Sequence, residues 1–442
     1  MAWKTDAFRT VSAVSIRLMP RGRARDVTSS LQVPNQIDQE RLVAEMKRFL
    51  IYLVTAVILT RGDAHAQQPL DIRTVLDGRM LPQEEVAAFE RSERLYPVRV
   101  VSRGAVIGTL PIADRRLENV KFQIGDKRYD LFDYLALNRV AGLLILKDGK
   151  IALEDYELGA GTDTRWASFS MAKSVTSRLI GAALEDRFIA SLDDPVTHYV
   201  PALRGGVYDG VSIRNVLQMA SGVRWNETYT DPNSDCRKLT DAQLGHRPGA
   251  SIAYMKDLSR AAPAGSAWNY NSGETNIAGA VVEGATHMGL ATYLSKKVWS
   301  RSGMEQDAFW WTESQGGMGI GGAGLSATLR DYGRFGLFVL SDGVIDGRRT
   351  VPKGWFEEAG TAHRIGAKSV DYGYLWWPLP VGDSIHEGAF EARGIFGQHL
   401  YINPSERLVI VVLSARPKPT GSTVLDDAAF FAAVARTLHR QQ

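Results

Sequence analysis

The stretch Ser168-Phe169-Ser170-Met171-Ala172-Lys173 opens the most regular helical pattern of the chain. Apolar residues recur at helical spacing from this point to about Glu185, so we predict a helix with Ser168 as its N-cap. Residues three apart share one face of a helix, which puts the amine of Lys173 beside the hydroxyl of Ser170. A capped helix start with a surface lysine explains the same residues equally well.

Serine and lysine at this spacing are suited to nucleophilic catalysis. A serine hydroxyl is a weak nucleophile that needs an adjacent base, and burial can lower the pKa of a lysine enough for it to accept the proton. Backbone N–H groups at the start of the helix favour a developing oxyanion. The pattern Ser170-x-x-Lys173 occurs once in the chain. We therefore predict that Ser170 is a nucleophile and Lys173 its base.

A second segment, Tyr270-Asn271-Ser272, follows a loop and precedes a predicted helix at residues 273–284. A nearby lysine cation would lower the pKa of a tyrosine from about 10, so that a phenolate could relay protons to a leaving group. Asn271 or Ser272 would add a polar side chain to the site. A loop tyrosine that only packs its ring is the competing interpretation.

A third segment, Gly394-Ile395-Phe396-Gly397-Gln398, precedes a predicted strand. Glycines beside an edge strand let a backbone N–H group approach a ligand closely. Paired with the N–H group of Ser170, such a group would form an oxyanion hole. The alternative is a simple turn.

Strand patterns lie near both ends of the chain, with helical patterns between them. Apolar runs at 142–146 and 151–156 flank Asp148-Gly149, which predicts a hairpin, and further strands are predicted at 400–402 and 408–413. Helices are predicted at 213–219, 290–299, 327–340 and 426–439, and loops at 223–265 and 316–324. We expect an α+β fold, in which helices flank an antiparallel sheet and an all-helical subdomain is inserted at about 180–300. This domain would span 116–442, after an irregular segment at 67–115.

The N-terminus has the pattern of an export signal. Met46-Lys47-Arg48 precedes an apolar run at 49–59 and the cleavage-type triplet Ala64-His65-Ala66. We predict a signal peptide at 46–66, a periplasmic or secreted protein without a stable membrane anchor after cleavage, and a mis-assigned gene start that adds 1–45. A buried or anchoring helix at 49–59 is the alternative.

Composition limits the classes of function. A formal net charge of +3 over 442 residues, without a basic stripe, excludes nucleic acid as a favoured partner. The single cysteine, Cys236, cannot form an intramolecular disulfide. Histidines lack the spacing of a metal site, and no phosphate-binding loop is present, so we expect neither a metal nor an organic cofactor. The sequence leaves the oligomeric state open.

With its three motifs in this order, the chain resembles the serine hydrolases related to class C β-lactamases and penicillin-binding proteins over about 130–440. It is most similar to the 6-aminohexanoate-dimer hydrolase branch in the segments 170–174, 207–210, 226–232 and 395–398. The resemblance implies a β-lactamase/transpeptidase-like fold and an acyl-enzyme on Ser170. It also implies base and relay roles for Lys173 and Tyr270, oxyanion N–H groups at Ser170 and Ile395, and a substrate contact for Tyr229. Ser272 and Gln398 are added as substrate-binding candidates.

One departure from that family bears on the substrate. β-Lactamases and DD-peptidases carry a Lys-Thr-Gly triad on the strand beside the site, where this chain has the apolar Ile395-Phe396-Gly397. We therefore expect no cation there for a β-lactam carboxylate, and a small ester or linear amide as substrate. A β-lactamase or DD-peptidase, and an inactive binding protein on the same fold, are the alternatives. The pairs Trp310-Trp311 and Trp376-Trp377 either line an apolar cleft or pack in the core.

Overall fold

The computed structural model describes residues 70–380 and 382–440 of the 442-residue chain. The predicted signal peptide at 46–66 and the extension at 1–45 lie outside these residues. Among the residues described, no helix is both long and apolar enough to cross a bilayer.

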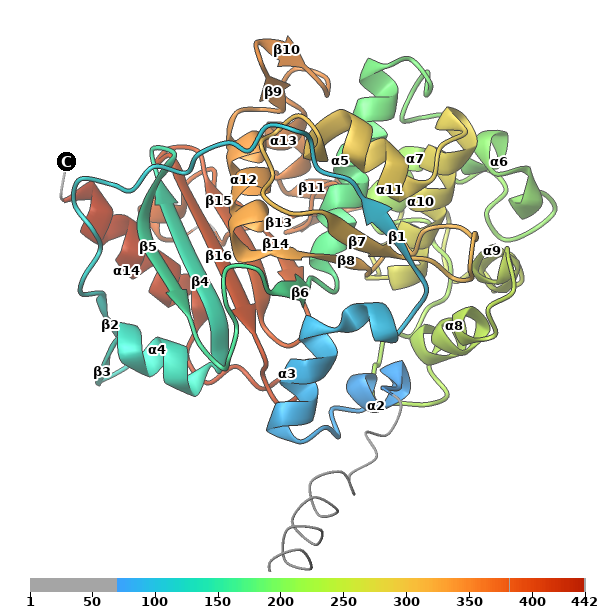
Figure 1. Ribbon diagram of the computed structural model, residues 1–442. Helices are drawn as coiled ribbons and strands as arrows, with labels where there is room; N and C mark the ends of the chain where they lie inside the picture. The colour runs from blue at the N-terminus through green and yellow to red at the C-terminus, as the bar shows by residue number, and fades with distance from the viewer. Residues whose placement is uncertain (1–69, 381, 441–442) are drawn as a thin grey trace, which may run out of the picture. The chain divides into compact units, whose positions relative to one another are not determined.

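A six-stranded antiparallel sheet is built from segments far apart in the sequence (Figure 1). Its strands lie in the order β13 (Trp377–Pro378), β14 (Phe390–Gly394), β15 (Gln398–Asn403), β16 (Leu408–Ser414), β4 (Val140–Lys147) and β5 (Lys150–Tyr156). Asp148 and Gly149 form the predicted hairpin turn, with φ of 52° and 76°, as a two-residue type I′ turn requires. The predicted sheet from both chain ends is confirmed.

Helices cover both faces of this sheet. The C-terminal helix α14 (Asp427–His439) packs its phenylalanines against Ile410 and Val412 on one face. On the other face, α12 (Leu329–Leu340) packs against the alternate residues Val409 and Val411 of β16, and α5 (Met171–Glu185) packs against β14 and β15. The period-two alternation of β16 thus supplies two hydrophobic cores, and the helices that cover both faces bury the whole strand.

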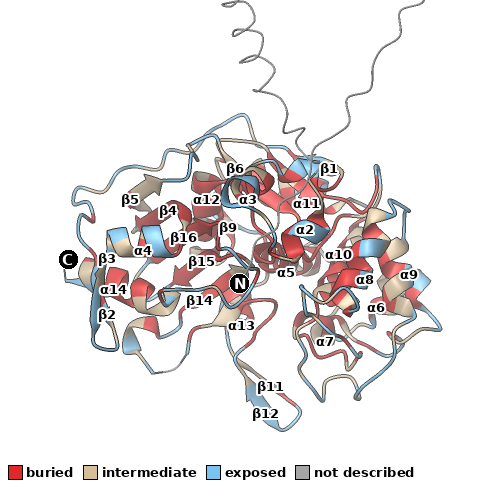
Figure 2. Ribbon diagram, turned by 90° about the horizontal axis from the view of Figure 1, so that it is seen from below, coloured by how far each residue is buried: buried red, intermediate tan, exposed pale blue. Residues whose placement is uncertain are grey.

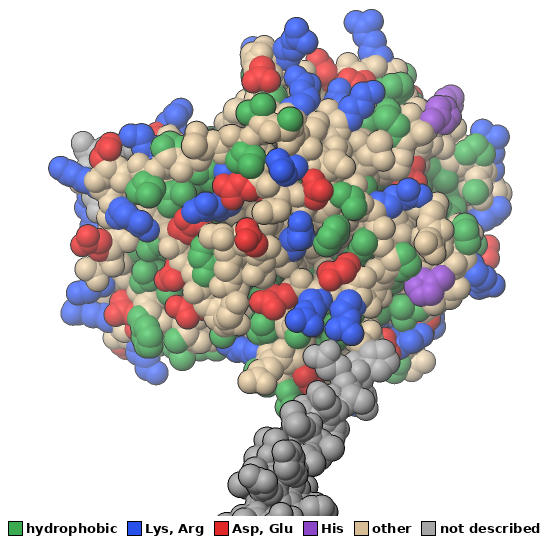
Figure 3. All heavy atoms as spheres, in the orientation of Figure 1, with side chains coloured by type: hydrophobic (Ala, Val, Ile, Leu, Met, Phe, Trp, Pro, Cys, Tyr) green, Lys and Arg blue, Asp and Glu red, His purple; other side chains and the backbone are tan. Residues whose placement is uncertain are grey.

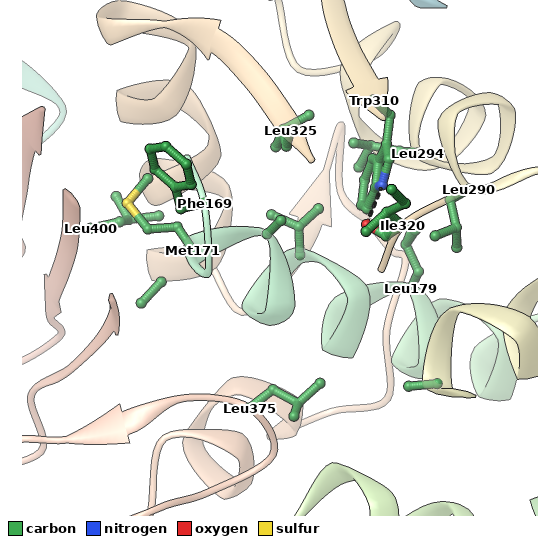
Figure 4. Packing of buried hydrophobic residues seen from close by; sticks show 14 of the residues in the cluster. Phe169, Met171, Leu179, Leu290, Leu294, Trp310, Ile320, Leu325, Leu375 and Leu400 are labelled. Atoms are coloured by element: carbon green, nitrogen blue, oxygen red, sulfur yellow. Dashed lines mark hydrogen bonds between the residues drawn. The ribbon is translucent and has the colours of Figure 1, made fainter. Parts of the chain in front are cut away.

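Helix α5 runs through the interior, because 13 of its 15 residues are buried. Figure 2 shows it red between the sheet and the helical part, and Figure 4 shows the hydrophobic side chains gathered around it. Polar residues of α5 must therefore find partners inside the protein. Ser174 donates to the carbonyl of Leu375, and Thr176 to that of Gly321.

The prediction of an irregular segment at 67–115 is wrong in part, because residues 70–101 contain regular elements. These elements are α2 (Ile72–Leu76), α3 (Pro82–Glu90), η1 (Ser92–Arg94) and β1 (Val98–Val101). β1 joins a second sheet of order β1-β7-β8-β6, with β6 (Arg165–Ala167), β7 (Ala308–Trp311) and β8 (Leu325–Thr328). The short elements lack a clear period in the sequence, and long-range pairing with β7 stabilises the strand.

Between β6 and β7, the regular elements of the chain are helices. After α5 they are α6 (Val196–Tyr199), η2 (Pro201–Leu203), α7 (Ile213–Leu217), α8 (Asp235–Leu244), α9 (Ala250–Lys256), α10 (Ser272–Thr286), α11 (Leu290–Leu294) and the π-helical turn η3 (Ser295–Trp299). The predicted loop at 223–265 is wrong in part, because α8 and α9 lie within it. Ser234 caps α8 by accepting a hydrogen bond from the Arg237 N–H group at 3.2 Å.

The start of α12 differs from the prediction. Thr328, expected inside a helix, ends strand β8 and accepts the Asp331 N–H group as N-cap of α12. The remaining elements are β2 (Lys121–Ile124), β3 (Lys127–Asp130), α4 (Leu131–Leu137), β9 (Val344–Ile345), β10 (Arg348–Arg349), α13 (Trp355–Ala359), β11 (His363–Ile365), β12 (Lys368–Val370) and η4 (Ser384–His386). On the face shown in Figure 3, basic and acidic side chains are interspersed.

Candidate functional site

Ser170 lies at the N-terminal end of α5 and is 8% exposed. It is itself the N-cap residue, with helical φ and ψ and no side-chain capping bond, so the prediction that Ser168 caps the helix is wrong. The hydroxyl of Ser168 instead donates to the Phe169 carbonyl. The Ser170 hydroxyl is thereby left free of a capping role.

The amine of Lys173 lies one turn along α5 and donates to Ser170 Oγ at 2.8 Å. A second bond, of 2.7 Å, goes to the carbonyl of Gly322 in the glycine-dense loop after β7. This loop passes so close to α10 that a side chain at Gly321 would meet the Thr275 carbonyl at 2.4 Å. Glycine is therefore required for the loop to bring a backbone acceptor to the lysine.

Burial changes the acidity of this lysine. Lys173 is 2% exposed, and removal from water disfavours its charged form, so its pKa falls to about 8. The carboxylate of Glu227 acts in the opposite direction and keeps the pKa from falling further. At neutral pH a useful fraction of Lys173 is thus a free base beside the Ser170 hydroxyl.

Tyr270 comes from the loop before α10 and meets this pair. Its hydroxyl is hydrogen-bonded to the Ser170 side chain, and the Lys173 amine lies 5.3 Å from the centre of its ring. The structure therefore brings Ser170, Lys173 and Tyr270 together, as predicted from three distant motifs. Burial and the negative charge of Glu227 raise the pKa of Tyr270 well above its ordinary value. The expected phenolate is therefore wrong, and Tyr270 is a neutral hydroxyl that can both donate and accept.

The segment after β14 approaches the Ser170 loop closely. A Cβ atom on Gly394 would lie 2.4 Å from the Ser168 carbonyl, so a larger residue would push the two apart. Phe169 and Phe396, both with positive φ, pack their rings in a tilted contact with centres 5.3 Å apart and hold the two loops together. Such strained backbone persists only where surrounding packing enforces it.

Ser170 and Ile395 each present a backbone N–H group that bonds to no acceptor within residues 70–380 and 382–440. Both residues line the same pocket. Two unpaired donors beside a nucleophile are the arrangement that stabilises an oxyanion. The positions of Ser170 and Ile395 therefore fit the predicted oxyanion hole.

The pocket beside Ser170 has a cavity volume of about 70 Å³. Its walls are mainly apolar and include Ile72, Leu76 and Tyr96 of the N-terminal segment and Trp311 of β7. Tyr229 and Ser272 also line it, so two of the predicted substrate-binding residues are placed at the pocket. No local sequence pattern indicates that Ile72, Leu76 and Tyr96 contribute to this wall.

Sequence reasoning missed Glu227, which organises the polar side of the site. Its carboxylate accepts from the Ser272 hydroxyl, the Ser272 N–H group at 3.0 Å and the Trp225 indole at 2.5 Å. It also bonds to the Tyr229 hydroxyl. A lone glutamate between two polar residues has no sequence signal that separates it from a surface charge.

Gln398 does not contact the pocket, which corrects its predicted role in substrate binding. The side chain is fully buried, and its amide bonds to the Trp166 indole and to both backbone groups of Ser414. The amide therefore joins the two sheets. A further bond to the Ile395 carbonyl helps to fix the segment after β14.

Each tryptophan pair divides between core and site. Trp310 and Trp376 are fully buried, whereas Trp311 lines the pocket. Trp377 is partly exposed and stacks on Tyr270, with ring centres 5.6 Å apart and planes 29° apart. Adjacent residues of a strand point to opposite faces, which explains the division of 310 and 311.

Residues 395–397 carry no cation, but a cation lies two residues earlier, on β14. Arg393, on β14, has its guanidinium carbon 5.3 Å from the centre of the Trp377 ring. Among the residues described, no group of three or more His, Cys, Asp or Glu side chains is arranged to hold a metal. Burial raises the pKa of the Cys236 thiol, so Cys236 lines the pocket as a neutral group.

The fold and this site define a class of protein. The beta-lactamase family model matches residues 137–435, and the chain belongs to that family. It is a serine hydrolase of the β-lactamase/transpeptidase-like fold. A 6-aminohexanoate-dimer hydrolase from Paenarthrobacter ureafaciens is 31% identical over 359 residues, covering 77% of this chain and 84% of that protein.

Solved structures share the architecture. A Bacillus anthracis protein that carries the provisional name 6-aminohexanoate-dimer hydrolase superposes with a TM-score of 0.71 at 23% identity, covering 81% of this chain and 94% of that one. A penicillin-binding protein homologue from Caulobacter crescentus gives a TM-score of 0.51 at 16% identity, covering 67% and 91%. These likenesses are to the fold.

Proposed function

We propose that this hydrolase cleaves a small carboxylic ester or linear amide, of the 6-aminohexanoate-dimer type, through an acyl-enzyme on Ser170. The observation that carries the proposal is the 2.8 Å bond between Ser170 Oγ and the amine of Lys173, a buried lysine with a pKa of about 8. The 31% identity with a 6-aminohexanoate-dimer hydrolase supports the substrate class.

In the first step, neutral Lys173 takes the hydroxyl proton as Ser170 Oγ attacks the substrate carbonyl. The carbonyl oxygen becomes an oxyanion between the N–H groups of Ser170 and Ile395. The acyl part occupies the apolar pocket lined by Leu76 and Trp311.

In the second step, the bond to the leaving amine or alcohol breaks. Tyr270 is neutral, so it gives its own proton to the leaving atom and regains one from the ammonium of Lys173. Water then attacks the acyl-enzyme by the reverse route and returns Ser170 to its starting state.

A hydrolysis screen tests this proposal. The rate of hydrolysis by native protein and by Ser170→Ala is measured for four kinds of substrate: short p-nitrophenyl esters, 6-aminohexanoate oligomers, D-Ala-D-Ala peptides and nitrocefin. We expect turnover of esters or oligomers that Ser170→Ala abolishes. Faster turnover of nitrocefin or D-Ala-D-Ala peptides would favour the β-lactamase or DD-peptidase alternative, and no turnover of any substrate would favour an inactive binding protein.

We also propose that the protein is exported to the periplasm or secreted, on the basis of the pattern at residues 46–66. N-terminal sequencing of protein from its natural host tests this. A mature chain that begins just after Ala66 is expected, and one that retains residues 1–45 would contradict the proposal.

A further inference from the structure

A row of three side chains leads away from Ser170 on the side of Tyr270. The Tyr270 ring stacks on Trp377 at 5.6 Å, and the Arg393 guanidinium lies 5.3 Å from the centre of the same Trp377 ring. Neither Trp377 nor Arg393 lines the pocket beside Ser170. The row therefore forms a second surface, separate from the acyl pocket and ending in a cation.

Arg393 has hydrogen-bond donors that remain unpaired among the residues described. Its side chain is 41% exposed, and its Nε atom donates to Glu391 at 2.5 Å. Its two terminal nitrogens donate to no acceptor in the described part of the chain. A guanidinium presents those two nitrogens as a fork that fits a carboxylate with two parallel hydrogen bonds.

Arg393 is the outer member of a buried cluster with an excess of positive charge. The cluster contains two carboxylates and three cations, joined by contacts of 2.5 to 3.2 Å: Glu391, Asp427, His399, Arg393 and Arg416. His399 is charged at neutral pH, because the two carboxylates raise its pKa to about 9. The excess charge is most accessible at Arg393, since the other four side chains are at most 13% exposed.

One further carboxylate acts on Arg393. Asp426, the N-cap of α14, favours the charged form of the arginine. Asp426 is itself exposed, so water screens its charge. It makes no ion pair with Arg393 among the residues described, and the terminal nitrogens remain open to a ligand.

We propose that Arg393 binds the carboxylate of a leaving group that carries an acid at its far end, such as an ω-amino or ω-hydroxy carboxylate. This inference rests on the proposed function, because Tyr270 must touch the leaving atom to protonate it. The leaving chain then lies along the Trp377 ring, and its carboxylate meets Arg393. A six-bond chain spans roughly 7 Å, by analogy with the reach of extended backbone. The path from the centre of the Tyr270 ring to the Arg393 guanidinium consists of two steps, of 5.6 Å and 5.3 Å, and a hydrogen bond at each end of the chain adds to its reach.

Paired substrates test the inference. N-hexanoyl-6-aminohexanoate and its terminal carboxamide share the acyl group and the scissile bond. They differ only in the charge of the end group that would meet Arg393. The corresponding esters form a second pair. In native protein we expect kcat/KM for the carboxylate to exceed that for the carboxamide by at least about tenfold, the lower range for a charge-assisted bond. In Arg393→Gln this ratio should fall to about one, mainly through KM.

Arg407→Gln is the matched control, because Arg407 is an exposed arginine that pairs with Asp148 at the β4–β5 turn. It should leave the ratio as in native protein. If Arg393→Gln does not fold, the salt dependence of native protein replaces it. A half-exposed site is screened, so the carboxylate preference should decline at high salt while carboxamide turnover stays constant.

The outcomes separate the two proposals. The role of Arg393 is overturned if native protein hydrolyses the carboxamide as fast as the carboxylate, or if the carboxylate preference survives Arg393→Gln. Either result leaves the proposed hydrolase function standing. Absence of Ser170-dependent turnover for both members of both pairs counts against the proposed function itself.

Discussion

The rate of acylation of Ser170 should follow the deprotonation of Lys173 as the pH rises. Lys173 is buried, and its pKa falls from 10.5 to about 8 because burial disfavours the ammonium. Only the neutral amine has a lone pair to accept the Ser170 proton. Below pH 8 the base is therefore mostly blocked, and raising the pH restores it.

The magnitude follows from the pKa. With a pKa of about 8, about 9% of Lys173 is neutral at pH 7, against about 0.03% for a lysine with the ordinary value of 10.5. Burial thus supplies roughly 300-fold more free base at neutral pH. The rate should rise about tenfold per pH unit well below pH 8 and become constant well above it.

Labelling with a fluorophosphonate measures this step, because fluoride leaves without protonation by Tyr270. The second-order rate of labelling, measured over the neutral to alkaline range, should show one inflection near pH 8. A pH-independent rate, or an inflection near the ordinary pKa of lysine, would show that Lys173 is not the base for this step.

Substitution of Glu227 sharpens the same experiment. Its negative charge favours the ammonium of Lys173, so Glu227→Gln should move the inflection to lower pH. Glu157→Gln is the control: it removes an exposed carboxylate that forms no ion pair among the residues described, and it should leave the inflection unchanged. An inflection that stays in place or rises in Glu227→Gln would show that Glu227 does not tune the lysine.

Three further predictions concern neighbouring groups. Burial raises the pKa of Glu274 from 4.5 to about 8, so between these pH values the folded state holds a proton that the unfolded state has released. The free energy of unfolding should therefore fall by about 1.4 kcal/mol per pH unit between pH 4.5 and pH 8. Glu274→Gln should flatten this slope in urea denaturation, and an unchanged slope contradicts the assignment. Gly394→Ala should reduce the labelling rate roughly 10²-fold by displacing the Ile395 N–H group, whereas Gly161→Ala, with open space around it, should have no effect. Tyr270→Phe should reduce kcat for amides by roughly 10² to 10⁴ and much less for p-nitrophenyl esters, whose leaving group needs no proton; equal losses would argue against a relay.

The sequence predicts best where a strong local pattern decides the structure. Helix α5 has a long apolar period, and Asp148-Gly149 has the backbone preferences of a tight hairpin turn, so both lie where expected. The three site segments could be found because each combines a reactive side chain or glycine with a predicted loop or helix start. Their convergence follows from the fold that the resemblance implied.

Other features depend on long-range contacts that leave no local pattern. The elements of 70–101 are short, and their roles in the pocket arise from packing against β7 and α8. Glu227 and Arg393 are ordinary charged residues in the sequence, and only the fold places them near Lys173 and Trp377. Gln398 was misjudged because proximity to Ile395 in sequence does not determine which way a strand residue points.

Trapping of the acyl-enzyme shows directly whether Ser170 is the nucleophile. The protein is mixed with a short p-nitrophenyl ester, quenched in acid and digested, and the acylated peptide is identified by mass. The account predicts one acyl group, on the peptide that contains Ser170, and none in Ser170→Ala. An acyl group on another residue, or one that persists in Ser170→Ala, would contradict it.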